Sequence, residues 1–153
     1  MKILRSASAT WTGTVPAGTG RMQLGRAGAQ LPFSLRSRTE DGVPGTNPEE
    51  LVGAAHAGCF SMSLSNLVEE AGLDPVEIST RATVTLEQGE QGFTISRVDL
   101  VTRGQVPGLD DAGFAALAEK AKATCPVSKL YASAQITLDA ALEPGPGTPD
   151  AGA

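Results

Sequence analysis

The sequence of 153 residues predicts an α+β fold. Segments of period-2 alternation occur near the start, in the middle and near the end of the chain, and two longer helical segments lie between them. Turn-forming pairs such as Asp41-Gly42 and Pro44-Gly45 separate neighbouring segments. We therefore expect antiparallel strands packed on two main helices.

The length of the chain is that of one domain, which we place at residues 1–142. Residues 143–153 are rich in Pro and Gly, and we expect them to form a disordered tail. Short alternating segments at residues 8–12, 20–24 and 30–35 predict three N-terminal strands joined by turns.

The first long helix has a clear start signal. Asn47 is a favourable N-cap, and Pro48 suits the first helical position. The carboxylates of Glu49 and Glu50 lie at the positive end of the helix dipole, and Asn47 with Glu50 approximates a capping box. Gly72 provides the stop, so the pattern predicts a helix from residue 48 to about residue 71.

Small or apolar side chains occupy every side of the middle of this helix, which is typical of a buried helix. We expect the helix at the centre of the molecule or of a dimer. Its polar interruptions and flanking glutamates make it a poor membrane span. The start of the chain lacks the continuous apolar stretch of a secretory signal, so a cytoplasmic location is expected.

The second half of the chain returns to strands and then to a helix. Period-2 segments at residues 79–86 and 93–102 predict a hairpin with one buried face. A second helix is expected at residues 111–123 and a last strand at residues 134–140. Cys125 precedes a proline at the exit of the second helix, and this disfavours helical geometry there.

Composition excludes several classes of function. The net charge of −5 and the small number of aromatic residues argue against nucleic acid as a partner. Two cysteines and one histidine, without a Cys-x-x-Cys pair, do not support a metal site, and the glycines form no P-loop. We therefore expect neither a metal nor a cofactor.

Cys59 lies inside the first helix, 12 residues after the N-cap. A reactive cysteine must be a thiolate, but the helix dipole fades beyond the first turn and an apolar setting raises the thiol pKa. A reactive Cys59 therefore requires a cation from elsewhere. The best suppliers are Arg36 and Arg38, at the end of the third strand and in the following loop.

Two residues close to Cys59 in sequence have alternative interpretations. Glu49 lies ten residues earlier, about 15 Å away along a helix, and cannot touch the thiol. It either favours the helix start or holds an arginine whose other face meets the thiolate. His56, three residues before Cys59, is either a base or a buried, hydrogen-bonded histidine, and we favour the second interpretation.

Cys125 sits at the C-terminal end of its helix, where the dipole disfavours a thiolate. That position suits a resolving thiol better than an attacking one. The residues alone leave two interpretations open, because Cys59 and Cys125 can be buried core residues or the two halves of a redox couple.

Two segments resemble the signatures of the OsmC/Ohr family, in its osmotically inducible protein C branch. They are G-T-N-P-E-E-L-V-G-A-A-H-A-G-C-F-S-M at residues 45–62 and K-A-K-A-T-C-P-V-S at residues 120–128. The resemblance covers residues 11–142 in the family's order. It implies an OsmC-like fold built as an intertwined homodimer, with active sites at the interface.

The resemblance also assigns roles to residues. It implies that Cys59 is the cysteine that attacks peroxide, that Cys125 is the resolving cysteine, and that Glu49 orients an arginine. Arg38 fits the family's loop context with a threonine in place of an aromatic residue, whereas Arg36 fits the spacing from a preceding phenylalanine. We choose Arg38 and keep Arg36 as the alternative.

The resemblance implies a thiol-dependent peroxidase that reduces organic hydroperoxides and also hydrogen peroxide. Cys59 would form a sulfenic acid, and Cys125 would condense with it to an intramolecular disulfide. A dithiol, of lipoyl type by the resemblance, would then reduce the disulfide. Two rival functions are a peroxide sensor and a dimeric module that binds apolar molecules and keeps both cysteines in its core.

Overall fold

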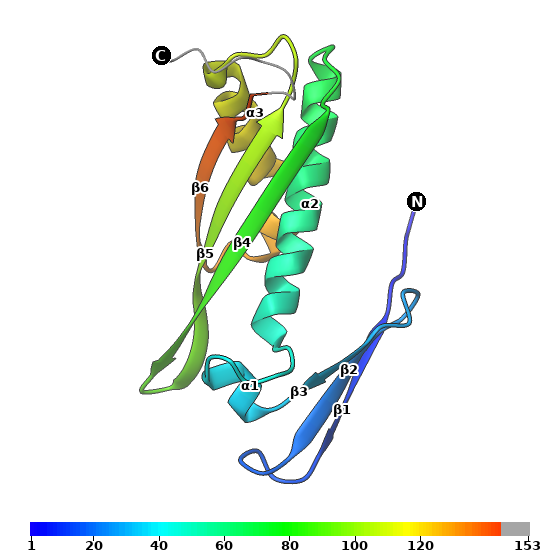
Figure 1. Ribbon diagram of the computed structural model, residues 1–153, viewed down its shortest axis with the longest axis vertical. Helices are drawn as coiled ribbons and strands as arrows, with labels where there is room; N and C mark the ends of the chain where they lie inside the picture. Colours follow the sequence, from blue (N-terminus) through cyan, green and yellow to red (C-terminus); the bar gives the residue numbers. More distant parts are fainter. Residues whose placement is uncertain (145–153) are drawn as a thin grey trace. The chain divides into compact units, whose positions relative to one another are not determined.

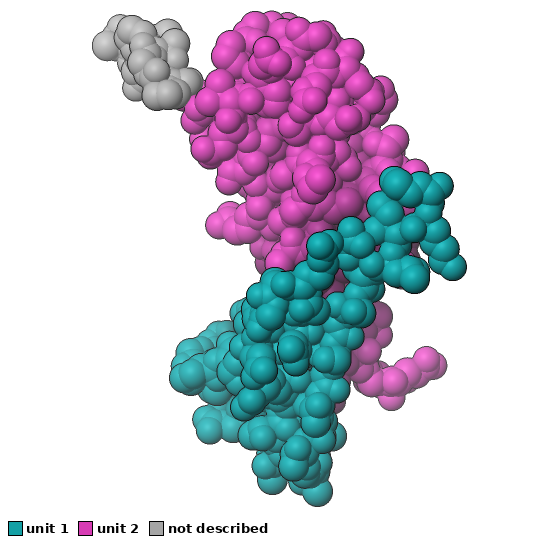
Figure 2. Space-filling model, turned by 90° about the vertical axis from the view of Figure 1, so that its right-hand side faces the viewer, with its two compact units in different colours: residues 1–51 teal, residues 52–153 magenta. Residues whose placement is uncertain are grey.

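The computed structural model of this protein describes residues 1–144. The chain divides into two compact units, residues 1–51 and residues 52–153 (Figure 2). The single domain expected at residues 1–142 stays a prediction. Apart from its first two residues, the tail expected to be disordered at residues 143–153 lies outside the described residues.

The first unit begins with a three-stranded antiparallel sheet in the order β1-β2-β3. Its strands are β1 (Ala7–Thr12), β2 (Thr19–Leu24) and β3 (Gln30–Phe33). All three N-terminal strands predicted from the alternation are thereby confirmed. The third ends earlier than expected, because a short helix begins two residues after Phe33.

That short helix is α1 (Leu35–Thr39), and the predicted strand end and loop at these residues were wrong. Ser34 is its N-cap and forms a capping box with Ser37: each side chain accepts a hydrogen bond from the other residue's backbone N–H. The reciprocal caps satisfy two backbone donors that a helix start otherwise leaves unpaired. Arg36 and Arg38 therefore lie on a helix.

The long helix α2 (Pro48–Glu70) confirms the first predicted helix. The Asn47 side chain accepts a hydrogen bond from the Glu50 backbone N–H at 2.9 Å, and Gly72 follows the helix with φ of +81°. The Glu50 carboxylate accepts a hydrogen bond from the Thr46 hydroxyl. By length and composition α2 could cross a membrane, a test that core helices also pass.

A second three-stranded sheet, in the order β4-β5-β6, forms the body of the second unit (Figure 1). β4 (Glu77–Gly89) and β5 (Gly92–Gln105) form the predicted antiparallel hairpin. β6 (Gln135–Leu142) pairs with β5 in parallel, which corrects the expectation of antiparallel strands throughout. The helical connection between β5 and β6 returns the chain to the same end of the sheet, as a parallel pair requires.

This connection contains α3 (Asp111–Thr124), which confirms the second predicted helix, and α4 (Pro126–Leu130), which the sequence analysis missed. The Asp110 side chain caps α3 by accepting a hydrogen bond from the backbone of Gly113. α2, α3 and the second sheet bury a common hydrophobic core. Its largest fully buried apolar members are Phe60, Leu64, Val68, Val98, Leu100 and Phe114. The α+β class is confirmed.

α2 has a buried and an exposed side within the single chain. His56, Phe60 and Leu64 are fully buried. Small or apolar residues on the opposite side are exposed, at positions 54, 55, 58 and 62, and the Met62 side chain is 76% exposed. The composition of α2 predicts a helix that is buried on every side. In one copy of the chain only one side of α2 is buried.

Candidate active site

The two cysteine sulfurs lie 3.2 Å apart. Cys59 is on α2, and Cys125 joins α3 to α4, so the second unit brings together two thiols that are 66 residues apart in sequence. Both are free thiols, because a disulfide would hold the sulfurs at about 2.05 Å. The geometry therefore places the two thiols where a disulfide can form with little movement.

Cys59 is the more accessible of the two thiols. It is half-buried, whereas Cys125 is fully buried. Cys59 borders an open, mainly apolar cavity of about 430 Å³. The other lining residues are Met62, Ser63, Asn66, Leu67, Thr124 and Pro126. A small molecule entering this cavity meets Cys59.

Burial raises the pKa of the Cys59 thiol, and the hydrogen-bonded Cys125 thiol raises it further. Hydrogen bonds from the backbone of Val127 and from the Ser63 side chain act in the opposite direction. The net shift is upward, as the sequence analysis expected from an apolar helix. A thiol with a raised pKa is a weak nucleophile at neutral pH, because little thiolate is present.

The pKa shift of the Cys125 thiol is opposite to the one expected from its position at the C-terminal end of α3. Burial raises the pKa of the Cys125 thiol. Hydrogen bonding lowers it and outweighs burial, so the net shift is downward. The groups that lower the pKa are the backbone of Ser128, the Cys59 thiol, the Ser128 side chain and the backbone of Val127. The cause is α4, for which Cys125 is the N-cap and Pro126 the first residue. A helix start leaves backbone N–H groups without intrahelical partners, and those of Val127 and Ser128 lower the pKa of the Cys125 thiol.

Arg38 and Glu49 form an ion pair within the first unit. The Arg38 guanidinium donates to both carboxylate oxygens, with Nη2 to Oε1 at 2.6 Å and Nε to Oε1 and Oε2 at 3.1 and 3.2 Å. The Glu49 side chain is only 10% exposed and the Arg38 side chain 33%, so the pair is partly shielded from water. Glu49 thus does more than favour the start of α2.

Arg36, the alternative to Arg38, has a different partner. Its guanidinium pairs with Glu40, one helical turn further along, and both side chains are largely exposed. Hydrogen bonding and charge attraction from Glu40 raise the Arg36 pKa above its ordinary value. The pair that joins an arginine to Glu49 is therefore made by Arg38.

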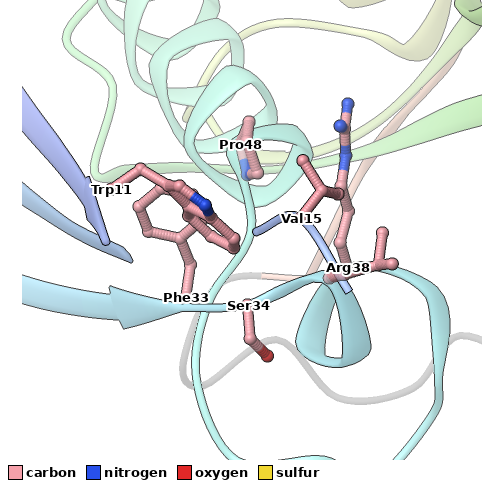
Figure 3. A pocket seen from close by; sticks show the side chains of 7 residues that line it. Trp11, Val15, Phe33, Ser34, Arg38 and Pro48 are labelled. Carbon is pink, nitrogen blue, oxygen red and sulfur yellow. The ribbon is translucent and has the colours of Figure 1, made fainter. Parts of the chain in front are cut away.

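An apolar pocket of about 210 Å³ lies beside Arg38 in the first unit (Figure 3). Trp11 and Phe33 form one wall, with ring centroids 5.4 Å apart and planes inclined at 48°. The remaining lining residues are Val15, Ser34, Leu35, Arg38 and Pro48. The pocket combines aromatic surface with the side of an arginine, a setting suited to an apolar group that carries a polar end.

His56 is fully buried, and its Nε2 atom lies 2.7 Å from the Ser128 hydroxyl oxygen. Its ring meets Tyr131 edge to face, with centroids 5.4 Å apart. Burial lowers the His56 pKa, which keeps the ring neutral. The interpretation of His56 as a buried, hydrogen-bonded histidine is confirmed.

Sequence reasoning did not single out Ser63, Ser128 or the Trp11–Phe33 pocket wall. A signal for Ser128 was present: the order Cys-Pro-Val-Ser puts an N-cap, a proline at the first helical position and a serine three residues after the cap. The aromatic wall carries no such local signal, because Trp11 and Phe33 come from strands that are neighbours only through β2.

Comparison with known proteins identifies the family. The family model described as "OsmC-like protein" matches residues 39–140, which include Glu49, Cys59 and Cys125 and begin directly after Arg38. The chain belongs to the OsmC family. The resemblance seen in the two cysteine segments is thereby confirmed.

Members of the OsmC family with curated names are close in sequence. Peroxiredoxin OsmC of Escherichia coli (strain K12) is 43% identical over 145 residues, which cover 94% of this chain and 99% of that protein. An organic hydroperoxide resistance protein of Xanthomonas axonopodis pv. citri is 39% identical over 88 residues, 57% of this chain and 60% of that protein. The prediction of a cysteine-based peroxidase agrees with these names.

Solved structures share the fold. The crystal structure of an organic hydroperoxide resistance protein from Elizabethkingia anophelis has a TM-score of 0.72 at 25% identity and covers 94% of this chain and 100% of that chain. An OsmC protein from Legionella pneumophila gives a TM-score of 0.68 at 22% identity, over 92% and 99% of the two chains. The OsmC-like fold is confirmed.

Proposed function

We propose that this OsmC-family chain is a thiol-dependent peroxidase that reduces organic hydroperoxides, and hydrogen peroxide as well, with Cys59 as the attacking thiol. The observation that carries the proposal is the pair of free sulfurs 3.2 Å apart, one beside an open cavity and the other fully buried. A peroxide can reach Cys59, and the resulting oxidised sulfur has a second thiol 3.2 Å away.

In the first step the Cys59 thiolate attacks the terminal oxygen of the hydroperoxide. The O–O bond breaks, Cys59 becomes a sulfenic acid, and the alcohol or water leaves after taking up a proton. Burial raises the Cys59 pKa, so this step needs a stabilising cation. We assign that role to Arg38, whose guanidinium is oriented by the Glu49 carboxylate.

In the second step Cys125 attacks the oxidised sulfur of Cys59, and the disulfide forms as water leaves. The buried position of Cys125 favours this role, because a peroxide in solution does not reach it directly. A dithiol then opens the disulfide by exchange. We propose a lipoyl-type dithiol, whose two thiols can complete the exchange within one molecule.

An organic substrate fits the apolar surfaces near the proposed residues. The cavity beside Cys59 contains Met62, Leu67 and Pro126, and the pocket beside Arg38 has Trp11 and Phe33 as its wall. Each can take hydrocarbon, and each has a polar group at its edge. We therefore expect an alkyl hydroperoxide to be reduced more efficiently than hydrogen peroxide.

We further propose that the chain forms a homodimer through the exposed side of α2, at residues 54, 55, 58 and 62. These side chains are small or apolar, and a second copy would cover them. Light scattering after gel filtration should give twice the chain mass for the parent. Ala55→Arg should shift the protein toward the monomer, whereas Gln88→Arg, an exposed control on β4, should not. A monomeric parent would contradict the proposal.

Steady-state turnover tests the peroxidase proposal. With tert-butyl hydroperoxide and dihydrolipoamide, the parent should consume many equivalents of peroxide, and Cys59→Ser should fall to the uncatalysed rate. Without reductant, Cys125→Ser should accumulate a sulfenic acid that dimedone traps on Cys59. Consumption near the parent rate in Cys59→Ser would refute the proposal. A parent that is oxidised once and does not turn over would indicate a peroxide sensor instead.

A further inference from the structure

A buried polar pair lies behind Cys125 and is not used in the steps above. The His56 Nε2 atom and the Ser128 Oγ atom are 2.7 Å apart, and the two residues are 0% and 4% exposed. Ser128 also lies in the first turn of α4, three residues after Cys125, and its side chain and backbone lower the pKa of the Cys125 thiol. The His56–Ser128 pair and the Cys125–Cys59 pair are thus joined through the first turn of α4, and Cys59 borders the cavity.

The nitrogen of His56 that has no partner indicates which atom is the donor in the His56–Ser128 hydrogen bond. Nδ1 is buried and has no hydrogen-bond partner among the described residues. A proton on Nδ1 would be a buried donor without an acceptor, which is the rarer and costlier defect, whereas a bare Nδ1 lone pair leaves only an acceptor unused. A neutral ring therefore carries its proton on Nε2, where the Ser128 oxygen accepts it.

With the oxygen of Ser128 occupied as an acceptor, its single O–H is free to point at Cys125. We propose that His56 and Ser128 are positioning residues for the resolving thiol: His56 Nε2–H donates to Ser128 Oγ, and the Ser128 hydroxyl donates to the Cys125 sulfur, which it holds as a thiolate aimed at Cys59. This proposal rests on the proposed function, because it gives the resolving step its nucleophile.

The resolving step balances with this arrangement. The Cys125 thiol releases its proton, and its thiolate attacks the Cys59 sulfur of the sulfenic acid. The S–S bond forms, the S–O bond breaks, and the departing hydroxide takes up one proton to become water. Cys125 is oxidised and Cys59 is reduced by the same electron pair. In the reverse direction, when a dithiol attacks Cys59, the same donors stabilise Cys125 as the leaving thiolate.

The groups that face His56 bear on the choice between a positioning role and a proton-accepting one. They are Ser128 and the half-buried Tyr131 ring, and Cys125 lies in the same helix start as Ser128. Burial raises the Tyr131 pKa, so the phenol stays neutral. A protonated His56 would be a buried cation with an unpaired N–H, which disfavours proton uptake. The pair acts by donating hydrogen bonds.

Ionisation of Cys125 can be measured without any peroxide. In a Cys59→Ala background, thiolate absorbance against pH reports Cys125 alone. Ser128→Ala should raise the Cys125 pKa by about one, as expected for the loss of one hydrogen bond to a charged sulfur. His56→Met should give a smaller rise, and His56→Gln, which keeps a donor, should stay near the parent. Ser61→Ala removes a hydroxyl that bonds Thr80 instead, and serves as the matched control.

The kinetic counterpart separates the two steps. In a single turnover, Ser128→Ala should leave the formation of the Cys59 sulfenic acid unchanged and slow its conversion to the disulfide about tenfold. Ser128→Thr, which keeps the hydroxyl, should convert at close to the parent rate. If the sulfenic acid never forms in the parent, the peroxidase proposal fails. The series of Cys125 pKa values still tests the proposed hydrogen bonds from His56 to Ser128 and from Ser128 to Cys125.

The tautomer of His56 can be measured in the unmodified protein. This measurement therefore tests the proposal even when a variant fails to fold. The chain has one histidine, and its ¹⁵N chemical shifts should show the proton on Nε2. A proton on Nδ1, or a Cys125 pKa that is the same in Ser128→Ala and Ser61→Ala, would overturn the proposal.

Discussion

Cys59 and Cys125 lie 3.2 Å apart but have opposite surroundings. Cys59 borders an open cavity, and burial raises its pKa. Cys125 is fully buried, yet donors from the start of α4 lower its pKa. The accessible thiol is therefore the less acidic one, and the acidic thiol is the one that solvent does not reach.

The two thiols thus divide between them the two properties that a peroxide-reducing cysteine needs, access to the peroxide and a low pKa. In the proposed mechanism a peroxide meets Cys59 first, and the attack by Cys59 depends on a cation that offsets its raised pKa. Cys125, the proposed resolving thiol, needs no contact with peroxide, and the groups that lower its pKa come mainly from the start of α4. Arg38, held by Glu49, is the proposed source of the cation.

Removal of the Arg38 cation should have the largest effect. Arg38→Met should lower the rate constant for sulfenic acid formation at neutral pH by about 100-fold, as expected when a charged donor is lost from a reacting centre. Stopped-flow mixing of the Cys125→Ser form with tert-butyl hydroperoxide measures this step. Arg36→Met, whose arginine pairs with Glu40, is the control and should react at the parent rate. Equal losses in both variants would remove Arg38 from the mechanism.

Loss of the Glu49 charge should have an intermediate effect. Glu49→Gln leaves the Arg38 guanidinium without its charged partner and so less well oriented. The same rate constant should fall about tenfold, the usual scale for a residue that orients another one. Glu40→Gln makes the equivalent change in the exposed Arg36 pair and should have no effect. A Glu49→Gln variant as fast as the parent would show that the ion pair is only structural.

The hydrogen bond from Ser63 should contribute less. Its side chain lowers the pKa of Cys59 against the effect of burial, so Ser63→Ala should raise that pKa. The rate of the first step at neutral pH should fall about threefold, and its pH profile should move upward, because less thiolate is present. Ser65→Ala, whose hydroxyl bonds Glu69, is the control. An unmoved pH profile in Ser63→Ala would exclude this hydrogen bond.

The smallest effect concerns folding stability against pH. Burial lowers the His56 pKa in the folded chain, whereas an unfolded histidine titrates near 6.5. The unfolded chain therefore binds a proton that the folded chain does not, and stability should fall as the pH drops below about 6.5, by at most about 1.4 kcal/mol per pH unit for one proton. Urea unfolding between pH 7.5 and 5.5 measures this slope. Because the chain has one histidine, His56→Gln should flatten it; an identical slope would contradict the account.

Local sequence signals predicted most of the fold. Asn47, Pro48 and Gly72 marked the ends of α2 correctly, because caps act within one helical turn. Signals were missed where one short segment carries the pattern of two different elements. The Ser34–Ser37 capping box starts α1 inside a segment that also alternates, and the proline after Cys125 starts α4 as well as ending α3.

The candidate site was predictable only in part, for a physical reason. The two cysteine segments carried the family resemblance, but the Cys59–Cys125 distance depends on packing between α2 and the α3–α4 junction. The lowered Cys125 pKa depends on α4, and without that helix the sequence indicated the opposite direction. The parallel pairing of β6 similarly follows from the helical connection and not from any pattern within the strand.

The most direct test of the central claim compares the two thiols one at a time. Each single-cysteine variant, Cys125→Ala and Cys59→Ala, is mixed with one equivalent of alkyl hydroperoxide, and intact-mass spectrometry follows the gain of one oxygen over time. The account predicts rapid oxidation when only Cys59 remains and slow oxidation when only the more acidic but buried Cys125 remains. Faster oxidation of Cys125 would contradict it and would reverse the roles of the two cysteines.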